Sequence, residues 1–374
     1  MQPFALERYF SRYEFSAKYT LSASDCESLT LEELLALADD STLGLWHNLK
    51  LGYTETPGHP CLLEAISRLY ESITPDRILV AAPEELIFIA MNVLLRKGDQ
   101  VIVTSPAYQS LHEIAASIGS QIHHWELRPV NDGWQLDLKF LEDHVTDKTK
   151  LIVINFPHNP TGHHISAEDQ REIIRIARRR NVVLFSDEMY RGAEYRADDR
   201  LPAITDIYER GISLWGLSKS FGLPGLRIGW IAANDADFLA KCSQFRDYLT
   251  ICNSAPGEIL GMIAARNAES LLKRSHRILL DNLSTADTFF LRHNLDLKWL
   301  RPKAGSVAFP ELRRDIPIEE FCRSLIERKN LLITPGSLFQ HAGNHFRVGI
   351  GRADFPKALA LLEEALLDPR HSSV

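Results

Sequence analysis

The sequence has few cysteines, no long apolar run and no surplus of positive charge. Its 374 residues include five cysteines, with no CxxC pair among them. An odd, scattered set of this kind argues against a disulfide framework or a zinc site and is typical of reduced thiols. No apolar run approaches the roughly 18 residues that a membrane-spanning helix needs, and the charged first residues do not fit a signal peptide. We therefore expect a cytoplasmic protein.

The charge balance excludes two kinds of partner. Lysine and arginine number 42 against 49 for aspartate and glutamate, which gives a formal net charge of −7. A chain this acidic is a poor candidate for binding nucleic acid or an anionic membrane. The basic run 178–180 closes a helical pattern that begins near Ser166, where cations suit the helix dipole. Small molecules are left as the expected partners.

Short β-branched runs alternate with amphipathic helical patterns through the middle of the chain. The expected strands are Ile78–Ala81, Gln100–Thr104, Lys150–Asn155, Val182–Ser186, Ser213–Gly216 and Ile228–Ala232. The expected helices are Glu84–Leu95, Ala107–Ile118, Leu138–His144 and Ser166–Arg180. This alternation predicts an α/β fold with a mostly parallel sheet and helices on both faces. Ligands bind at the carboxyl ends of strands in such sheets, so functional residues should follow the strands.

The pattern changes near residue 256, which indicates a second domain. One long helical stretch runs from Gly257 to His293. Short strands are expected after it, at Phe309, Leu331–Thr334 and His345–Gly349. The first 45 residues lie outside the alternating pattern and are expected to pack with the C-terminal region. The expected parts are an N-terminal segment over 1–45, a large domain over 46–260 and a small α/β domain over 261–374.

Four local motifs carry the chemistry, and three of them directly follow expected strands. They are Asn155-Phe-Pro-His-Asn159-Pro-Thr-Gly162, Asp187-Glu-Met-Tyr190, the segment from Ser218-Lys219 to Arg227, and Phe346-Arg347-Val-Gly349. Each motif alone has an ordinary explanation, such as a turn, a solvated helix start or a surface ion pair. Their occurrence together, in this order and at strand ends, favours a single site.

These residue types suit a cofactor that carries an aldehyde and a phosphate. A lysine can form a Schiff base with an aldehyde when its amine is neutral. An aspartate can keep a pyridine nitrogen protonated, so that the ring withdraws electrons from a substrate carbanion. Asparagine and tyrosine can hydrogen-bond a phenolate oxygen. One guanidinium can bind the phosphate and another a carboxylate through paired N–H groups.

From about Gly52 to Arg352, the motifs resemble those of the class I/II aminotransferases, which are pyridoxal 5′-phosphate (PLP) enzymes of fold type I. The resemblance implies a mostly parallel seven-stranded sheet in a large domain and a smaller α/β domain. It implies PLP as the cofactor and an α-amino acid and a 2-oxo acid as substrates. It also implies a homodimer with shared active sites.

The resemblance implies a role for each matching residue. Lys219 would hold PLP as a Schiff base and move the proton at the substrate α-carbon. Asp187 would pair with the pyridine nitrogen, and Asn159 and Tyr190 would bind the phenolate oxygen, with Tyr190 counted among the catalytic residues. Arg227 would bind the phosphate.

Further matches concern the substrate and the outer parts of the cofactor. Arg347, together with Asn159, would bind the substrate carboxylate. Tyr108 would stack on the pyridine ring, and Ser218 would bind the cofactor beside the lysine. Tyr53 would reach the phosphate in the neighbouring subunit.

Three positions depart from the family pattern. The phosphate-binding turn reads Ala82-Pro83-Glu84-Glu85 instead of Gly-Ser/Ala-x-Glu, and Pro83 has no N–H to offer an anion. We expect Glu84 to bind through its backbone N–H with its side chain turned away. Gly216 replaces a frequent serine, and Leu63 a frequent arginine.

Other functions remain open on these residues. The N-terminal stretch resembles the branch that includes capreomycidine synthase, so a PLP-dependent lyase, cyclase or dehydratase is an alternative to an aminotransferase. Aminotransferase-like domains also serve as effector sensors in transcription regulators, but about 50 residues before the fold leave no room for a DNA-binding domain. A cofactor-free pseudoenzyme is a further alternative, motivated by the altered phosphate-binding turn.

Overall fold

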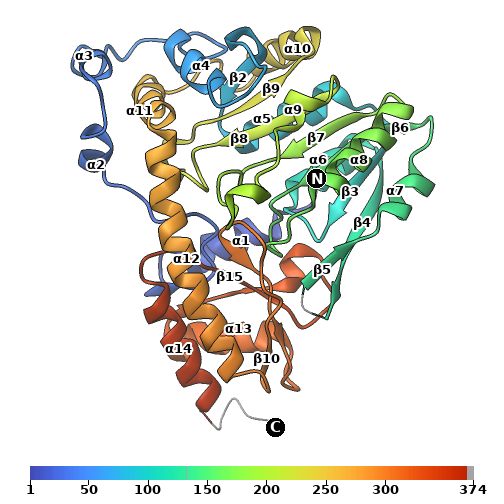
Figure 1. The fold of residues 1–374 in the computed structure, drawn as a ribbon, viewed down its shortest axis with the longest axis vertical. Helices are drawn as coiled ribbons and strands as arrows, with labels where there is room; N and C mark the ends of the chain where they lie inside the picture. The colour runs from blue at the N-terminus through green and yellow to red at the C-terminus, as the bar shows by residue number, and fades with distance from the viewer. Residues whose placement is uncertain (132, 369–374) are drawn as a thin grey trace.

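The fold is built on one large sheet with helices on both faces (Figure 1). The computed structural model describes residues 1–131 and 133–368; positions 132 and 369–374, which fall in the expected large and small domains, lie outside it. The sheet order is β2-β9-β8-β7-β6-β3-β4-β5. In that order the strands are Ile78–Ala81, Gly229–Ala233, Gly211–Gly216, Val183–Asp187, Thr149–Asn155, Gln100–Ser105, Gln121–Val130 and Gly133–Leu136.

Most neighbouring strands run parallel, as the sequence predicts. Strands β8, β7, β6, β3 and β4 are mutually parallel, whereas β9 runs against both of its neighbours. The sheet has eight strands instead of the expected seven. The additional strand is β5, which folds back on the end of β4 and pairs Leu127 with Leu136. The hairpin extends the edge of the sheet beyond the family-based expectation.

Alternating side chains of the strands supply two cores, one on each face of the sheet. Val101 and Val103 of β3 pack in the core that includes α5 (Pro83–Leu94) and α6 (Ser110–Ile118). Ile102 lies in the other core with Ile173 of α8 (Ala167–Arg179). Successive residues of a strand point to opposite faces, so an apolar run without alternation is what a sheet covered on both sides requires.

The small domain lies below the large sheet in Figure 1 and contains a separate three-stranded sheet. Its strands, in spatial order, are β11 (Val307–Ala308), β15 (Phe346–Gly349) and β14 (Thr334–Pro335). Its helices are α12 (Ala268–Arg292), α13 (Ile318–Lys329) and α14 (Phe355–Leu367). Among the helices of the described residues, none is long and apolar enough to cross a bilayer.

Two expected elements of this region are divided in the structure. The single helical stretch is two helices, α11 (Ala255–Arg266) and α12, which meet at Asn267. The Asn267 side chain donates to the carbonyls of Leu37 and Ile263, so its amide group is hydrogen-bonded at the point where the two helices meet. The expected strand 331–334 is also divided, because β13 (Leu331–Leu332) and β14 belong to different sheets.

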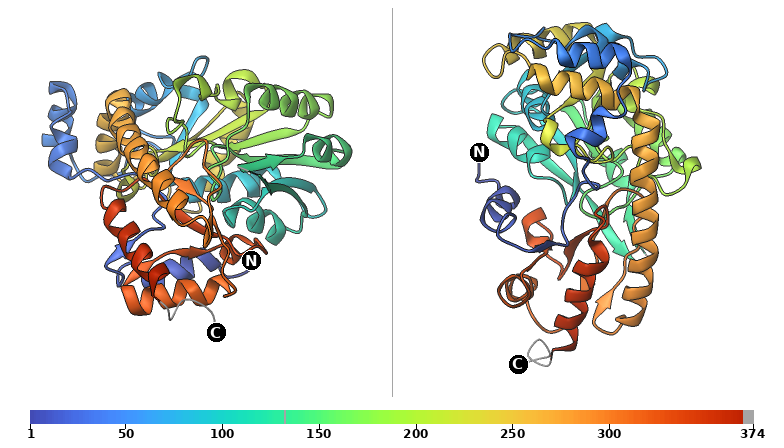
Figure 2. Two further views of the ribbon diagram at one scale, coloured as in Figure 1. Left: turned by 60° about the horizontal axis from the view of Figure 1, so that its bottom comes forward. Right: turned by 90° about the vertical axis from the view of Figure 1, so that its left-hand side faces the viewer.

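The N-terminal segment contacts both parts of the molecule. Helix α1 (Ala5–Tyr13) precedes β1 (Tyr19–Thr20), which pairs in parallel with β13 of the small domain. Helices α2 (Leu31–Leu35) and α3 (Asp40–His47) pack against α11. Figure 2 shows these two helices beside α11, far from α13 and α14. Residues 21–27 run between these two regions, and Cys26 in this segment donates its N–H to the Lys219 carbonyl just beyond the carboxyl end of β8.

Candidate active site

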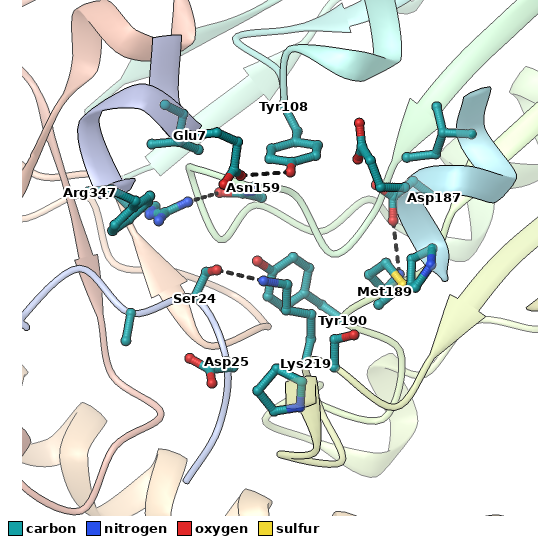
Figure 3. Close-up of a pocket in the computed structure, with 18 of the residues that line it drawn as sticks. Glu7, Ser24, Asp25, Tyr108, Asn159, Asp187, Met189, Tyr190, Lys219 and Arg347 are labelled. Atoms are coloured by element: carbon teal, nitrogen blue, oxygen red, sulfur yellow. Dashed lines mark hydrogen bonds between the residues drawn. The ribbon is translucent and has the colours of Figure 1, made fainter. Parts of the chain in front are cut away.

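A cavity of about 310 Å³ lies where the large sheet, the small domain and the N-terminal segment meet (Figure 3). Nine of the predicted site residues line it: Glu84, Tyr108, Asn159, Asp187, Tyr190, Ser218, Lys219, Arg227 and Arg347. Eight of them lie at strand ends of the large sheet, along the edge where a doubly wound sheet binds its ligands, and Arg347 lies within β15 of the small domain. Lys219 and Asp187 therefore share one cavity, as the proposed chemistry requires.

Lys219 follows β8 by three residues and points into this cavity. Its Nζ donates a hydrogen bond to Ser24 Oγ at 2.7 Å. Burial lowers the pKa of Lys219 from its usual value, although the Asp25 carboxylate nearby acts in the opposite direction. A lowered pKa increases the fraction of neutral amine, which is the form that can bond to an aldehyde or take up a proton.

Asp187 is the last residue of β7, and its carboxylate is buried. Oδ1 accepts the backbone N–H of Met189 at 3.0 Å, and the Asp187 carbonyl accepts from Asn155 Nδ2 at 3.0 Å. Burial raises the pKa of Asp187 to about 7. A cation placed beside this carboxyl would favour its ionised form, so the position suits the protonated nitrogen of a pyridine ring.

Arg347 of β15 is 1% exposed and is fixed on several sides. Nη1 donates to Asn159 Oδ1 at 3.1 Å, and Nη2 donates to the Ser22 carbonyl at 2.9 Å. The rings of Phe10 and Phe339 lie 5.6 and 5.1 Å from the guanidinium carbon. Nε has no hydrogen-bond partner among the described residues. The guanidinium is thus held in place with N–H capacity left for an anion.

The polar groups around Lys219 fit a bound PLP. Within the part of the chain that the structure describes, the buried hydroxyl of Ser218 has no hydrogen-bond partner, and that of Tyr190 has none of normal geometry, although Ser24 lies beside it. Buried polar groups are normally satisfied, so these two point to a ligand with oxygen atoms. Arg227 lines the same cavity and supplies a cation for a phosphate.

The Glu84 side chain is partly turned from the cavity toward Ser110. Oε2 of Glu84 accepts the Ser110 hydroxyl at 3.1 Å, and burial raises the pKa of this carboxyl to about 7. A carboxyl with a raised pKa is protonated more easily, which lessens its repulsion of an anion. Glu84 is the second residue of α5, where a backbone N–H has no partner inside the helix. The unusual turn around Pro83 therefore still offers a donor to a phosphate.

The two predicted tyrosines differ in their surroundings. Tyr108 lines the cavity, and its hydroxyl donates to Glu7 Oε1 at 2.9 Å. Tyr53 is 92% exposed and is not among the described residues that line the cavity. Tyr53 is thus the one predicted site residue that does not lie near the others within a single chain.

Several residues that line the cavity were not predicted. Glu7, Glu14, Ser24 and Asp25 come from the N-terminal segment, and Asp25 pairs with Arg352 at 2.7 Å. Their local sequence contains no recognisable motif, because their partners lie far away along the chain. Asn155 begins the first motif and does not itself line the cavity in the described residues, but its side chain joins the ends of β6 and β7 through a bond to the Asp187 carbonyl.

This fold and this cavity define a PLP-dependent enzyme of fold type I. The family model for aminotransferase class I and II matches residues 18–358. The chain therefore belongs to the class I and II aminotransferase family, and PLP is its cofactor. The predictions of family, fold type and cofactor are confirmed.

Relatives of two activities resemble this chain. Capreomycidine synthase of Streptomyces vinaceus is 30% identical over 96% of this chain and 93% of that enzyme. The crystal structure of a PLP-dependent aminotransferase from Streptococcus suis has a TM-score of 0.92 and 30% identity, and the match covers 100% of this chain and 99% of that one. The PLP-dependent cyclase OrfR has a TM-score of 0.91 and 28% identity, over 99% and 98% of the two chains.

Proposed function

We propose that the protein is an aminotransferase that moves an amino group from an α-amino acid to a 2-oxo acid. The observation that carries the proposal is that Lys219, Asp187 and Arg347 line one cavity. They supply an amine, a buried carboxylate and a guanidinium, which are the groups needed to hold an aldehyde, a ring nitrogen and a substrate carboxylate.

Each part of PLP has residues to hold it. Lys219 would bind the aldehyde carbon covalently, and Asp187 would pair with the ring nitrogen. The other contacts would be Asn159 and Tyr190 to the phenolic oxygen, Tyr108 to the ring face, and Arg227, Ser218 and the Glu84 N–H to the phosphate. When bound, PLP supplies an electron sink for the charge that forms at the substrate α-carbon.

The residues of the chain then bind the substrate and move its proton. Arg347 holds the substrate carboxylate through paired N–H donors and so fixes the orientation of the α-carbon. The neutral Lys219 Nζ takes the proton from that carbon and later returns it. Leu6 and Phe10 of α1 add apolar side chains to the wall of the cavity.

The half-reaction with a single amino acid tests this proposal. The purified protein should show the visible absorption band of bound PLP, and a reactive amino acid should convert it to the aminated cofactor with release of a 2-oxo acid. Lys219→Ala should remove both the original band and the conversion. A protein that released no 2-oxo acid from any amino acid would contradict the assignment.

A ring-forming or eliminating enzyme is the second candidate, which two observations favour. Two of the relatives described above are named as a synthase of capreomycidine and a cyclase. In addition, Glu7, Glu14 and Asp25 place three carboxylates along the cavity. These carboxylates favour a substrate with a basic side chain, whose nitrogen can act as an internal nucleophile. Such an enzyme would release a cyclic or unsaturated product without accumulating aminated cofactor.

We also propose a homodimer that works in the reducing cytoplasm. Tyr53, Leu51 and Tyr248 are strongly exposed, as expected of side chains that a second copy covers. Thr54 Oγ1 donates to the Asn253 carbonyl at 3.2 Å, so the segments that carry Tyr53 and Tyr248 lie side by side. All five cysteines are free, which suits a reducing compartment.

A further inference from the structure

The amine of Lys219 is held by a hydroxyl from a distant part of the chain. Nζ donates to Ser24 Oγ at 2.7 Å across 195 positions. Within residues 1–131 and 133–368, Ser24 is the one hydrogen-bond partner of this amine. We propose that Ser24 is a positioning residue, which orients the Lys219 amine for proton transfer at the substrate α-carbon. This inference rests on the proposed function, because it concerns the same proton.

The backbone of Ser24 is fixed by both halves of the molecule. Its carbonyl accepts the Ser306 hydroxyl of the small domain at 2.7 Å. The next but one residue, Cys26, donates its N–H to the carbonyl of Lys219 at 3.2 Å. The hydroxyl and the amine therefore belong to two segments that are bonded to each other through their backbones. A group fixed in this way can direct a side chain with little loss of entropy.

The same segment also holds the arginine expected to bind the substrate carboxylate. Arg347 Nη2 donates to the Ser22 carbonyl at 2.9 Å, two residues before Ser24. Gly349 donates its N–H to the Leu21 carbonyl at 2.7 Å. The substrate carboxylate and the Lys219 amine are thus both positioned by one short backbone segment, residues 21–24. This arrangement links the place of the α-carbon to the direction of the amine.

A hydroxyl suits this task better than a charged group. A neutral amine has two N–H bonds and one lone pair, so an acceptor for one N–H restricts the direction of the lone pair. The charged groups that face Lys219 are Asp25, Arg347, Glu7, Asp187 and Glu14. A carboxylate bonded to the amine would retain the proton that Lys219 has to give back, because it favours the ammonium form. Ser24 bonds the amine without adding charge.

The first test measures proton transfer in the half-reaction. Ser24→Ala should slow single-turnover removal of the α-proton by about tenfold or more, because the Lys219 amine is then no longer held in one orientation. The deuterium isotope effect on that step should rise, the KM for the amino acid should change little, and Ser24→Thr should restore the rate. Ser24→Cys keeps the size of the side chain but is a weak acceptor, so it should behave like Ser24→Ala.

Ser220→Ala is the matched control. Ser220 is also buried and next to Lys219, and its hydroxyl has no partner among the described residues. It is not among the described residues that line the cavity. Its replacement removes the same atoms from the same region without touching the Lys219 amine.

The second test uses the cofactor-free protein and needs no turnover. The rate at which Lys219 reacts with an amine-selective reagent is followed against pH by mass spectrometry. Loss of an acceptor disfavours the ammonium form, so Ser24→Ala should lower the midpoint by about half a pH unit, the equivalent of a hydrogen bond of modest strength. Ser24→Thr and Ser220→Ala should keep the native midpoint.

The outcomes separate this inference from the proposed function. If Ser24→Ala and Ser24→Cys match Ser220→Ala in proton transfer and in the labelling midpoint, the inference is overturned. If the native protein converts no amino acid, the aminotransferase proposal fails. The labelling midpoint then still decides whether Ser24 directs the amine.

Discussion

The buried carboxyl of Asp187 should make the cofactor-free protein less stable as pH rises. Its pKa is raised to about 7 by burial, above the ordinary value of 3.8. Between these values the unfolded state loses its proton while the native state keeps it, so stability falls with pH and is lowest above the native pKa. Asp187→Asn removes this penalty and should raise the free energy of unfolding by about 2–4 kcal/mol at pH 8, and by little at pH 4.

Denaturant unfolding of the cofactor-free protein at the two pH values measures this difference. Asparagine keeps an oxygen for the Met189 N–H, so the local backbone bond is retained. An equal effect of the substitution at both pH values would show that Asp187 is not the titrating group.

The same variant should be a poor enzyme. If Asp187 pairs with the ring nitrogen as proposed, this substitution would leave that nitrogen without an anionic partner and would weaken the stabilisation of charge at the α-carbon. We expect Asp187→Asn to lower the rate of the half-reaction by about 10²-fold or more, as loss of a preorganised electrostatic partner does elsewhere. Stopped-flow absorbance measures this rate. Retention of the native rate would remove Asp187 from the catalytic residues.

Arg347→Lys should weaken substrate binding more than it slows the chemistry. A lysine cannot offer paired N–H donors to a carboxylate, nor reach both Asn159 Oδ1 and the Ser22 carbonyl. The KM for the amino acid should rise about tenfold or more, from the loss of one charge-assisted bond. Arg352→Lys is the control, because Arg352 lines the same cavity but is paired with Asp25. Equal effects of the two substitutions would place the substrate carboxylate elsewhere.

At the scale of single residues, the local sequence was enough to predict that residues directly after strands would meet in one cavity. Lys219, Asp187 and Asn159 could be predicted because a strand end fixes where its next residues lie. Ser24 and Glu7 could not, because their place in the cavity depends on bonds with residues far away in the sequence. The roles of all these residues remain predictions until they are tested.

At the scale of elements, the contact between β15 and residues 21–25 is too close for a side chain. A Cβ on Gly349 would lie 1.8 Å from the Ala23 carbonyl oxygen. Gly349→Ala should therefore lower the free energy of unfolding by about 1–3 kcal/mol or more and displace Ser24. Gly44 is a matched control, since its Cβ would meet nothing within 4 Å and it lies inside α3. Gly44→Ala should be neutral or stabilising by up to about 1 kcal/mol. Thermal unfolding of both variants tests the contrast.

The predicted helices and strands agree with the structure where an element is buried along its whole length. They are wrong where exposed residues or single side-chain hydrogen bonds determine where an element begins or ends. Strands β6 and β8 are buried along nearly their whole length, which a β-branched or apolar run reveals. The hairpin of β4 and β5 has a mixed exposed pattern and was not predicted. The division of the long helix at Asn267 depends on a bond to the Leu37 carbonyl, which no periodicity contains.

At the scale of the whole molecule, mixing two variants tests whether Tyr53 acts across subunits. In a dimer of Tyr53→Phe subunits, each site would have the partner's phenylalanine in place of Tyr53 and should therefore bind PLP weakly. After exchange with Lys219→Ala subunits, hybrid dimers would contain one site with both Lys219 and Tyr53. PLP affinity and half-reaction should then rise toward native values in that site. No gain on mixing, or a monomer in sedimentation, would contradict shared sites.

The large-scale architecture was predicted from the alternating pattern together with the family resemblance. The limits of the domains at 46–260 and 261–374 remain predictions. The N-terminal segment shows why such limits are hard to set from sequence. β1 pairs with β13, whereas α2 and α3 pack against α11.

The bond between Ser22 and Arg347 also bears on the order of synthesis. It joins residues 325 positions apart. At a translation rate of about 5–20 residues per second, the earlier residue leaves the ribosome tens of seconds before the later one is made. The strand ends that carry Asp187 and Lys219 can form during this time. The opposite wall of the cavity, which includes Arg347, can form only after β15 has been made. A nascent chain halted before β15 would therefore carry an open, half-built pocket.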